Sequence, residues 1–231
     1  MRYAFFGIFL VAIVVLLYYL YESINRPVEF NKTWAARKVV VHKQLEDIVE
    51  LQKMYKVLHD DTSYAGSFDD MIKTFLEDSF SILRIEGDPY DTLKKADTLR
   101  VRLAAKDSMF SYIAKIGYLK AEDFDKNKSD NAFKETKVKE YITSMSYVPF
   151  SEYKSKNIPQ IKFEIKSGSV NLEGSRLAAN FATPTFEVST LVGTYMPEYE
   201  PQEYSMYNPD FDPKKLVKVG DLTKVTTAGN W

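Results

Sequence analysis

An unbroken apolar run near the N-terminus constrains this chain more than any other feature of its sequence. It comprises residues 4–21 (AFFGIFLVAIVVLLYYLY) and contains no charged side chain. As an α-helix with a rise of 1.5 Å per residue, it extends about 27 Å, close to the ~30 Å of a bilayer's hydrocarbon core. Core helices of soluble proteins seldom stay apolar on every face over such a length. The run therefore predicts a transmembrane helix that contacts the lipid bilayer through residues 4–21.

The flanks of this run distinguish an anchor from a cleaved signal peptide. Tyr18, Tyr19 and Tyr21 close the run, as expected for amphipathic rings at a membrane interface. A signal peptide would have a shorter apolar region followed by small residues at a cleavage site. Here the sequence continues instead with YESINRP. We therefore expect residues 1–26 to remain in the mature protein as its membrane anchor.

The charges beside the anchor leave its orientation open. Arg2 precedes the apolar run, and the cations that follow it are Arg26, Lys32, Arg37, Lys38 and Lys43. The positive-inside rule alone would place the following domain in the cytoplasm. Large domains can nevertheless cross the membrane despite nearby charge, so a domain outside the cytoplasm stays compatible with the sequence.

The rest of the 231-residue chain has the composition of an ordinary folded protein. About 200 residues follow the anchor, which is enough for one domain or two small ones. Lys and Arg number 31 and Asp and Glu 32, so the net charge is -1 and no broad basic surface is available to bind nucleic acid. Cysteine is absent, which excludes disulfides, thiolate metal sites and cysteine nucleophiles.

Residues 27–80 have the pattern of a helical stalk followed by a short second helix. After an elbow expected at Pro27, apolar side chains recur every three or four positions, which predicts a long amphipathic helix over residues 33–60. The stripe consists of Val41, Leu45, Ile48, Gln52, Tyr55 and Leu58. Such a stripe requires a partner to cover it.

Shorter elements are predicted after the stalk. A capping box at residues 67–70 (SFDD) predicts a helix over residues 68–78. Apolar alternation at residues 99–103 is typical of a strand, and the spacing at residues 109–116 is typical of a helix. Residues 126–131 (KNKSDN) are expected to form a solvated loop.

A change of period to two predicts strands in the last third of the chain. Apolar and charged side chains alternate over residues 161–165, and Ser167 and Gly168 are expected to turn the chain into a second strand at residues 170–172. A further strand is predicted at residues 186–190. Together these strands predict a small antiparallel sheet with one face on the core.

The predicted fold class is therefore α+β: an N-terminal transmembrane helix continues into a long amphipathic helix packed on a small antiparallel β-sheet. Three consecutive parts are expected, namely the anchor (1–26), the helical stalk with the second helix (27–80), and a mixed soluble domain (81–231). Residues 195–213 are rich in Tyr, Pro and acids and predict an extended loop. Packing of this loop on its own domain is favoured over partner binding, which stays the alternative.

These segments resemble a known family. An apolar helix running into an amphipathic one, then LEDIVELQKMYKVLHDDTSYAGSFDDMI at residues 45–72, resembles type IV pilins and the pseudopilins of type II secretion systems. Residues 229–231 (GNW) are similar to the end of major pseudopilins. The same segments, with residues 147–150 (YVPF) and 228–231 (AGNW), resemble uncharacterised envelope proteins of Bacteroidota. One feature departs from the pilin pattern, because Gly7 is followed by no acidic residue before Glu22, so prepilin processing is not implied.

The resemblance implies a function and a location. We expect a non-enzymatic, single-pass, pilin-like structural or assembly subunit of a bacterial cell-envelope secretion or pilus-type machine, anchored in the inner membrane with its soluble domain in the periplasm. Its partners would be other membrane or periplasmic proteins of an envelope complex. A membrane-tethered periplasmic binding module for a peptide or glycan is the alternative.

The chain offers few residues for catalysis or cofactor binding. It has only two histidines: His42, expected on the solvated side of the long helix, and His59, expected near its C-terminal end. No nucleotide-binding or hydrolase motif is present, so no catalytic residue or cofactor is predicted. Asp210, Asp212 and Asp221 could supply oxygen ligands to Ca²⁺. The resemblance supports that metal site, because pseudopilins bind calcium in their C-terminal loop, whereas ordinary solvated loop acids are the simpler interpretation.

Overall fold

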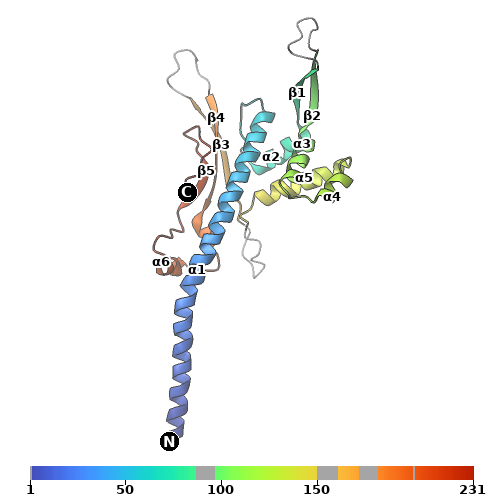
Figure 1. Cartoon of the computed structure of the whole chain (residues 1–231). Helices are drawn as coiled ribbons and strands as arrows, with labels where there is room; N and C mark the ends of the chain where they lie inside the picture. The colour runs from blue at the N-terminus through green and yellow to red at the C-terminus, as the bar shows by residue number, and fades with distance from the viewer. Residues whose placement is uncertain (1, 87–96, 150–160, 172–181, 200) are drawn as a thin grey trace. The chain divides into compact units, whose positions relative to one another are not determined.

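The architecture comes from a computed structural model, which describes residues 2–86, 97–149, 161–171, 182–199 and 201–231 (Figure 1). One long N-terminal helix, α1 (Arg2–Leu58), is followed by shorter helices and by strands that form a three-stranded sheet, in the order β3-β4-β5, and a separate β1-β2 hairpin. The predicted α+β class, with a long N-terminal helix and a small antiparallel sheet, is confirmed.

Helix α1 is continuous through Pro27. A proline inside a helix has no N–H to donate, so the carbonyl of Ser23 loses its usual partner. The helix nevertheless continues, and the Asn31 side chain donates to the Pro27 carbonyl over 2.9 Å. The elbow expected at Pro27 therefore does not separate the anchor from the stalk, which form a single helix.

The surroundings of α1 change along its length. It is the one helix in the described part of the chain that is long and apolar enough to cross a membrane, and none of its apolar window is buried. Further along, the predicted stripe is confirmed, because Val41, Leu45, Ile48 and Gln52 are fully buried and Tyr55 nearly so. Leu58, at the end of the stripe, is half-buried. Gln44 and Leu51 are buried as well. The C-terminal part of α1 is thus covered on more than one side.

The chain forms two compact units, and each combines segments that are far apart in the sequence. The first unit contains Met1–Lys43 and Leu191–Leu216, and the second contains Gln44–Pro149, Gln160–Thr190 and Val217–Trp231. The boundary between them falls inside α1.

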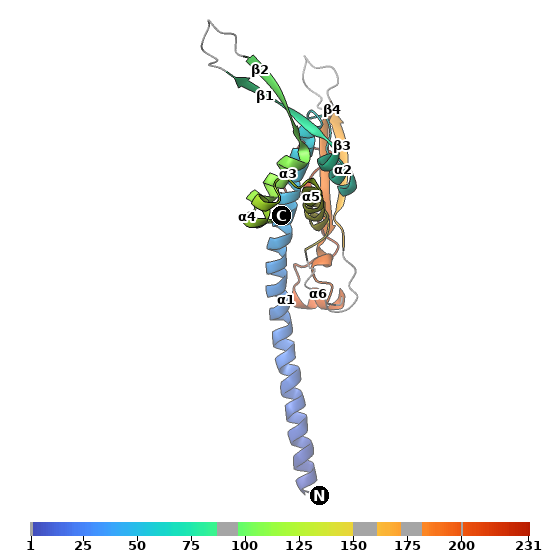
Figure 2. The ribbon, with the colours of Figure 1, turned by 90° about the vertical axis from the view of Figure 1, so that its right-hand side faces the viewer.

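The second unit is layered around residues 44–58 of α1. Figures 1 and 2 show the sheet on one side of this part of α1 and helices α2, α3 and α5 on another. Gln44 fixes the helical side, since its amide nitrogen donates to the carbonyl oxygens of Ser144, Met145 and Tyr147 at 3.3, 3.0 and 2.8 Å. These carbonyls lie at the end of α5 (Asn131–Met145) and just beyond it, where helical partners run out.

The sheet belongs to the second unit and has β4 at its centre. Strand β3 (Glu164–Asn171) pairs antiparallel with β4 (Ala182–Leu191), from Glu164↔Ser189 to Asn171↔Ala182, and β5 (Leu216–Gly220) lies on the other side of β4. Phe186 and Val188 on β4 are buried, as expected for the core face.

The turn predicted at Ser167 and Gly168 is wrong. Both residues lie inside β3, opposite Phe186 and Thr185 of β4. Gly168 is exposed and Ser167 has a small side chain, so an outer strand accommodates them without loss of core packing. The strand expected at residues 170–172 is the end of β3, and Leu172 lies outside the described residues.

The remaining elements of the second unit follow its predicted pattern only in part. Helix α2 (Phe68–Glu77) begins at the predicted cap, where the Ser67 hydroxyl accepts from the Asp70 N–H over 3.0 Å. The predicted strand and helix near residues 99–116 are β2 (Asp97–Ala104), paired with β1 (Ser79–Glu86), and α3 (Ala105–Lys115). Two helices, α4 (Ala121–Lys126) and α5, border the loop expected at residues 126–131 and were not predicted.

The Tyr-rich segment of the first unit is more regular than an extended loop. It starts in a 3₁₀ turn, η1 (Val192–Tyr195), and contains helix α6 (Pro201–Tyr207). The prediction of a loop throughout residues 195–213 is therefore wrong. The favoured expectation that this segment packs on its own chain is confirmed, because Tyr204 and Phe211 are buried.

Candidate functional site

The N-terminal part of α1 exposes apolar side chains on every face. Over residues 6–24 nearly every side chain is exposed, with 71% of Phe6 and 68% of Tyr21 accessible. Soluble proteins rarely expose apolar surface on this scale. By length and composition this part of α1 is a candidate membrane span, and lipid is the solvent that suits it.

An aromatic cluster lies against one face of α1 directly after this apolar part. Phe30 is fully buried, and its ring centroid lies 4.9 Å from that of Tyr199 and 5.2 Å from that of Phe211. We call the cluster the aromatic collar; its members are Phe30, Trp34, Tyr199, Tyr204, Tyr207 and Phe211. Each edge-to-face pair adds about 0.5–1.5 kcal/mol beyond the burial of area. The collar thus fixes the 196–211 segment to one face of the helix.

Two ion pairs flank the collar along α1. Arg26 contacts Glu203 over 2.7 Å, and Arg37 forms a two-pronged pair with Glu198 at 2.7 and 3.0 Å. The Arg37 side chain is only 12% exposed, so this pair is screened less than an ordinary surface pair.

Sequence reasoning missed this contact surface, although a signal for it exists. Arg26, Phe30, Trp34 and Arg37 follow one another at intervals of four, four and three residues, which places them on one helical face. A stripe that mixes charged and aromatic residues does not form an apolar helical pattern. Its partner segment also lies about 170 positions away in the sequence, so no local rule connects the two.

The hydroxyl groups of the collar are tied within the first unit. The Tyr204 hydroxyl donates to the Met196 carbonyl over 3.0 Å, and that of Tyr207 donates to Glu203 over 3.1 Å. Burial, together with the nearby carboxylates of Glu198 and Glu203, raises the pKa of the Tyr204 phenol. The phenol therefore remains a neutral hydrogen-bond donor at physiological pH.

An apolar pocket of about 260 Å³ lies in the second unit, where the end of α1 meets α2 and α3. Its only side-chain polar groups are the hydroxyls of Ser108 and Tyr112. The lining residues are Met54, Val57, Leu58, Phe75, Phe80, Ala105, Ser108, Met109 and Tyr112. Such a lining suits an aliphatic or aromatic group and lacks the polar partners that a glycan requires. No sequence pattern indicates this pocket, because its lining residues come from four separate elements.

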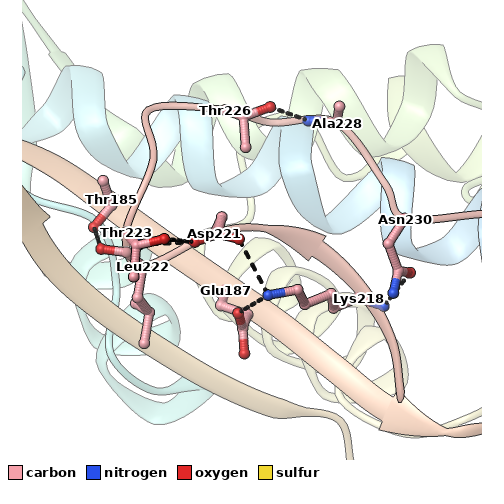
Figure 3. A network of polar contacts seen from close by, with 9 residues as sticks. All are labelled: Thr185, Glu187, Lys218, Asp221, Leu222, Thr223, Thr226, Ala228 and Asn230. Atoms are coloured by element: carbon pink, nitrogen blue, oxygen red, sulfur yellow. Dashed lines mark hydrogen bonds and ion pairs between the residues drawn. The ribbon is translucent and has the colours of Figure 1, made fainter. Parts of the chain in front are cut away.

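Asp221, one of the three proposed calcium ligands, belongs to a network of polar contacts in the second unit (Figure 3). Its carboxylate accepts from the hydroxyl and N–H of Thr223 at 2.6 and 2.8 Å and from Lys218 at 3.2 Å. The Thr223 bonds and the Lys218 charge lower the pKa of Asp221 to about 2. Lys218 also contacts Glu187 over 2.6 Å, so the network joins β5 to β4.

The other two proposed ligands lie on the surface of the first unit. Asp212 accepts from the Lys214 N–H over 2.9 Å, and Asp210 donates its own N–H to the Asn208 side chain. Within the described ranges, no three His, Asp or Glu side chains form a group that could hold a metal ion. The calcium site stays a prediction, and the geometry of these acids does not support it.

The final residues fold back on β5. Val219 and Gly229 form an antiparallel bridge, and Asn230 bonds Lys218 through both its N–H and its side-chain oxygen (Figure 3). A Cβ atom on Gly229 would lie 2.3 Å from the Trp231 ring, so a larger residue at this position would require the exposed Trp231 side chain to move. The Gly-Asn-Trp ending therefore has a structural role in the described fold.

His42, expected on the solvated side of the long helix, is half-buried, and His59 lies near the C-terminal end of α1, as expected. The His59 ring stacks on Tyr55 with centroids 4.2 Å apart, and its Nδ1 lies 3.1 Å from the Tyr55 carbonyl oxygen. His59 thus lies just beyond the end of α1, where a carbonyl accepts its N–H and the helix dipole favours it.

Comparisons with protein-family models, with curated proteins and with solved structures found no match to this chain.

Proposed function

We propose that the protein is a membrane-anchored, pilin-like structural or assembly subunit of a bacterial cell-envelope secretion or pilus-type machine. One observation carries this proposal: a single 57-residue helix is bare and apolar in its N-terminal part and buried beside an antiparallel sheet in its C-terminal part. A helix of this kind can hold a folded domain at the membrane and leave its apolar part available to lipid and to neighbouring helices.

The roles of the polar side chains also favour a scaffold. Gln44 and Gln52 are buried and are bound to backbone groups, and Asp221 holds a turn. These groups complete the hydrogen bonding of the fold, and their bonding leaves them little freedom to take part in proton transfer or nucleophilic chemistry.

The location belongs to the same proposal. The soluble part faces the periplasm of a bacterial inner membrane, as the pilin resemblance implies. Protease added to intact spheroplasts should digest the part beyond α1, and it should do so without lysis. Protection in intact spheroplasts and digestion only in lysates would place this part in the cytoplasm.

Purification from native membranes tests the assembly role. The full chain, extracted in a mild detergent and isolated without crosslinking, is expected to bring other envelope proteins with it in fixed proportion. The Val14→Arg variant is the matched control, because it should lose membrane insertion and, with it, the same companions. A wild-type chain that purifies as a monomer would contradict the proposal.

The apolar pocket favours a second candidate function, a membrane-tethered binding module. Its lining points to an apolar side chain of a peptide rather than to a glycan. Ser108→Trp should fill the pocket from its rim, because Ser108 is exposed and its replacement does not disturb the core. A monomer that retains an apolar ligand in native mass spectrometry, and loses it in Ser108→Trp, would favour this candidate over the assembly subunit.

A further inference from the structure

One face of α1 exposes apolar side chains beyond the apolar run. Ile24, Val28 and Val39 are 60%, 61% and 67% exposed, and Ala35 is exposed as well. From Ile24 to Val39 these positions follow at intervals of four, seven and four residues, which brings them onto one face of an α-helix. We call these four residues the outer patch. All of them belong to the first unit.

The aromatic collar does not cover the outer patch. Each residue of an α-helix turns the chain by about 100°, so side chains two positions apart point in nearly opposite directions. Val28 is two positions from Phe30, and Val39 is two positions from Arg37, and both of these neighbours contact the 196–211 segment. The outer patch therefore points away from that segment, and none of the described residues buries it.

The bilayer reaches only the beginning of the outer patch. Val28 and Val39 lie seven and eighteen residues beyond Tyr21, which is about 10 and 27 Å along the helix axis. The headgroup layer adds only about 5–7 Å to each side of the hydrocarbon core. If residues 4–21 span that core, the outer patch from Val28 onward lies beyond the lipid. Aligned apolar side chains in water mark a surface for another protein.

Lysines border the outer patch. Lys32 follows Val28 by four residues and Lys43 follows Val39 by four, so each lies one turn further along the same face. Both lysines are exposed, and neither pairs with an acid of the described residues. On the collar side, by contrast, both arginines are paired with acids of their own chain. The charge beside the outer patch is thus left for an acidic partner.

We propose that the outer patch binds an amphipathic helix of another membrane-anchored subunit, in which acidic residues flank the apolar side chains. The inference rests on the assembly role proposed above and names the chemistry of the partner. Contact with Val28 and Val39 buries apolar surface, and carboxylates opposite Lys32 and Lys43 select the partner. A second copy of the chain matches less well, because its exposed charges over residues 27–43 are mostly lysines.

Photocrosslinking tests this proposal in native membranes. A photo-reactive phenylalanine analogue replaces Val28 or Val39 in the full chain, and the crosslinked peptide is sequenced. We expect an adduct with an amphipathic helix of another protein that carries acids beside its apolar positions. Lys32→Glu should reduce the yield of this adduct several-fold, because it places like charges together. Lys53→Glu is the matched control at an exposed lysine outside the outer patch, and it should leave the yield unchanged.

Several results would overturn the proposal. These are an adduct with residues 24–43 of a second copy, adducts with lipid alone, a crosslinked segment without acids, and a yield that Lys32→Glu does not change. The analogue at position 14 separates this inference from the assembly role. A protein adduct at position 14 but none at 28 or 39 would reject the outer patch and leave the assembly role intact. No protein adduct at any of the three positions would reject both.

Discussion

The two parts of α1 show how one helix can serve two environments. Residues 6–21 are apolar on all faces and bare, whereas Val41, Leu45 and Ile48 follow a helical spacing and are fully buried. Both parts are α-helical with the same backbone hydrogen bonding. They differ in how the apolar side chains are distributed over the faces of the helix. An apolar side chain on every face requires an apolar medium, and a stripe requires only a partner within the chain.

The same comparison decides what the stripe covers. Had it faced neighbouring subunits, Leu45 and Ile48 would be exposed in the single chain, but both are fully buried. The stripe therefore serves folding of the chain itself. The pilin-like proposal places contacts with other subunits on the bare part of α1.

The largest expected effect comes from placing a charge in the bare, apolar part of α1. Val14→Arg should abolish stable membrane insertion, because an arginine at mid-bilayer costs about 2.5–3.5 kcal/mol on insertion scales. Val39→Arg is the same substitution at a side chain that is 67% exposed, and it should leave insertion and stability unchanged. Alkaline extraction of membranes measures the insertion of both variants. If Val14→Arg remains in the membrane pellet, the bare part of α1 is not the anchor.

A truncation in the buried part should have the next largest effect. Ile48→Ala removes fully buried methylenes and should lower the free energy of unfolding by about 2–5 kcal/mol. Val40→Ala, at a half-exposed position on the same helix, should change it by less than about 0.5 kcal/mol. Urea unfolding of the full chain in detergent separates the two. Equal stability of both variants would mean that the stripe covers nothing.

A smaller effect is expected at Gln52, a polar member of the buried stripe. Its side chain donates to the Ala65 carbonyl over 3.1 Å and accepts from the Ala65 N–H over 2.9 Å. Gln52→Ala leaves both backbone groups buried without a partner, at a cost of about 1–3 kcal/mol. The same urea experiment measures it, with the exposed Gln202→Ala as control. An unchanged midpoint would show that water replaces the amide.

The smallest expected effect is the loss of stability at low pH when the Asp221 carboxylate is protonated. The pKa of Asp221 is lowered from 3.8 to about 2, so its contribution to stability is present above pH 3.8 and is lost as the pH falls through about 2. Trp34→Phe leaves Trp231 as the sole tryptophan, and its emission should change as the final turn loosens in that window. Asp221→Asn should show the loosened emission already at neutral pH. If the Trp231 emission changes over the same pH range with and without Asp221→Asn, the change belongs to another titratable group.

Much of the fold could be predicted wherever a local rule applied. The stripe of α1 followed from helical spacing, and α2 followed from its Ser67 cap. Strand β4 followed from alternation at Phe186 and Val188. In each case the residues that decide the structure are neighbours in sequence.

The failures occurred where tertiary contacts overrode composition. In α5 only Val138, Tyr141 and Ile142 are apolar and buried, among three lysines and other polar residues, so the segment has no strong helical pattern. Pro201 begins α6 at a position where its missing N–H costs nothing, but in a Pro-rich segment it favoured a loop. Ser167 and Gly168 have turn composition, yet pairing with β4 keeps them in a strand.

The candidate site was predictable to a similar degree. The candidate membrane span could be identified from residues 4–21 alone, because length and apolar composition are local properties of the sequence. The collar could not, because the contacts of Phe30 are with residues 199–211 and only the fold brings them together. The pocket likewise combines α1, α2, β1 and α3, whose meeting no sequence period encodes.

Solvent accessibility along α1 in membranes tests the central claim most directly. Single cysteines in the cysteine-free full chain are treated with a membrane-impermeant maleimide applied to both sides of the bilayer. The account predicts no labelling at any position from 6 to 20, whatever the face, labelling at the exposed Val39 and Lys53, and protection at Leu45 and Ile48. A labelled face within residues 6–20, or a mature protein that begins beyond residue 26, would contradict it.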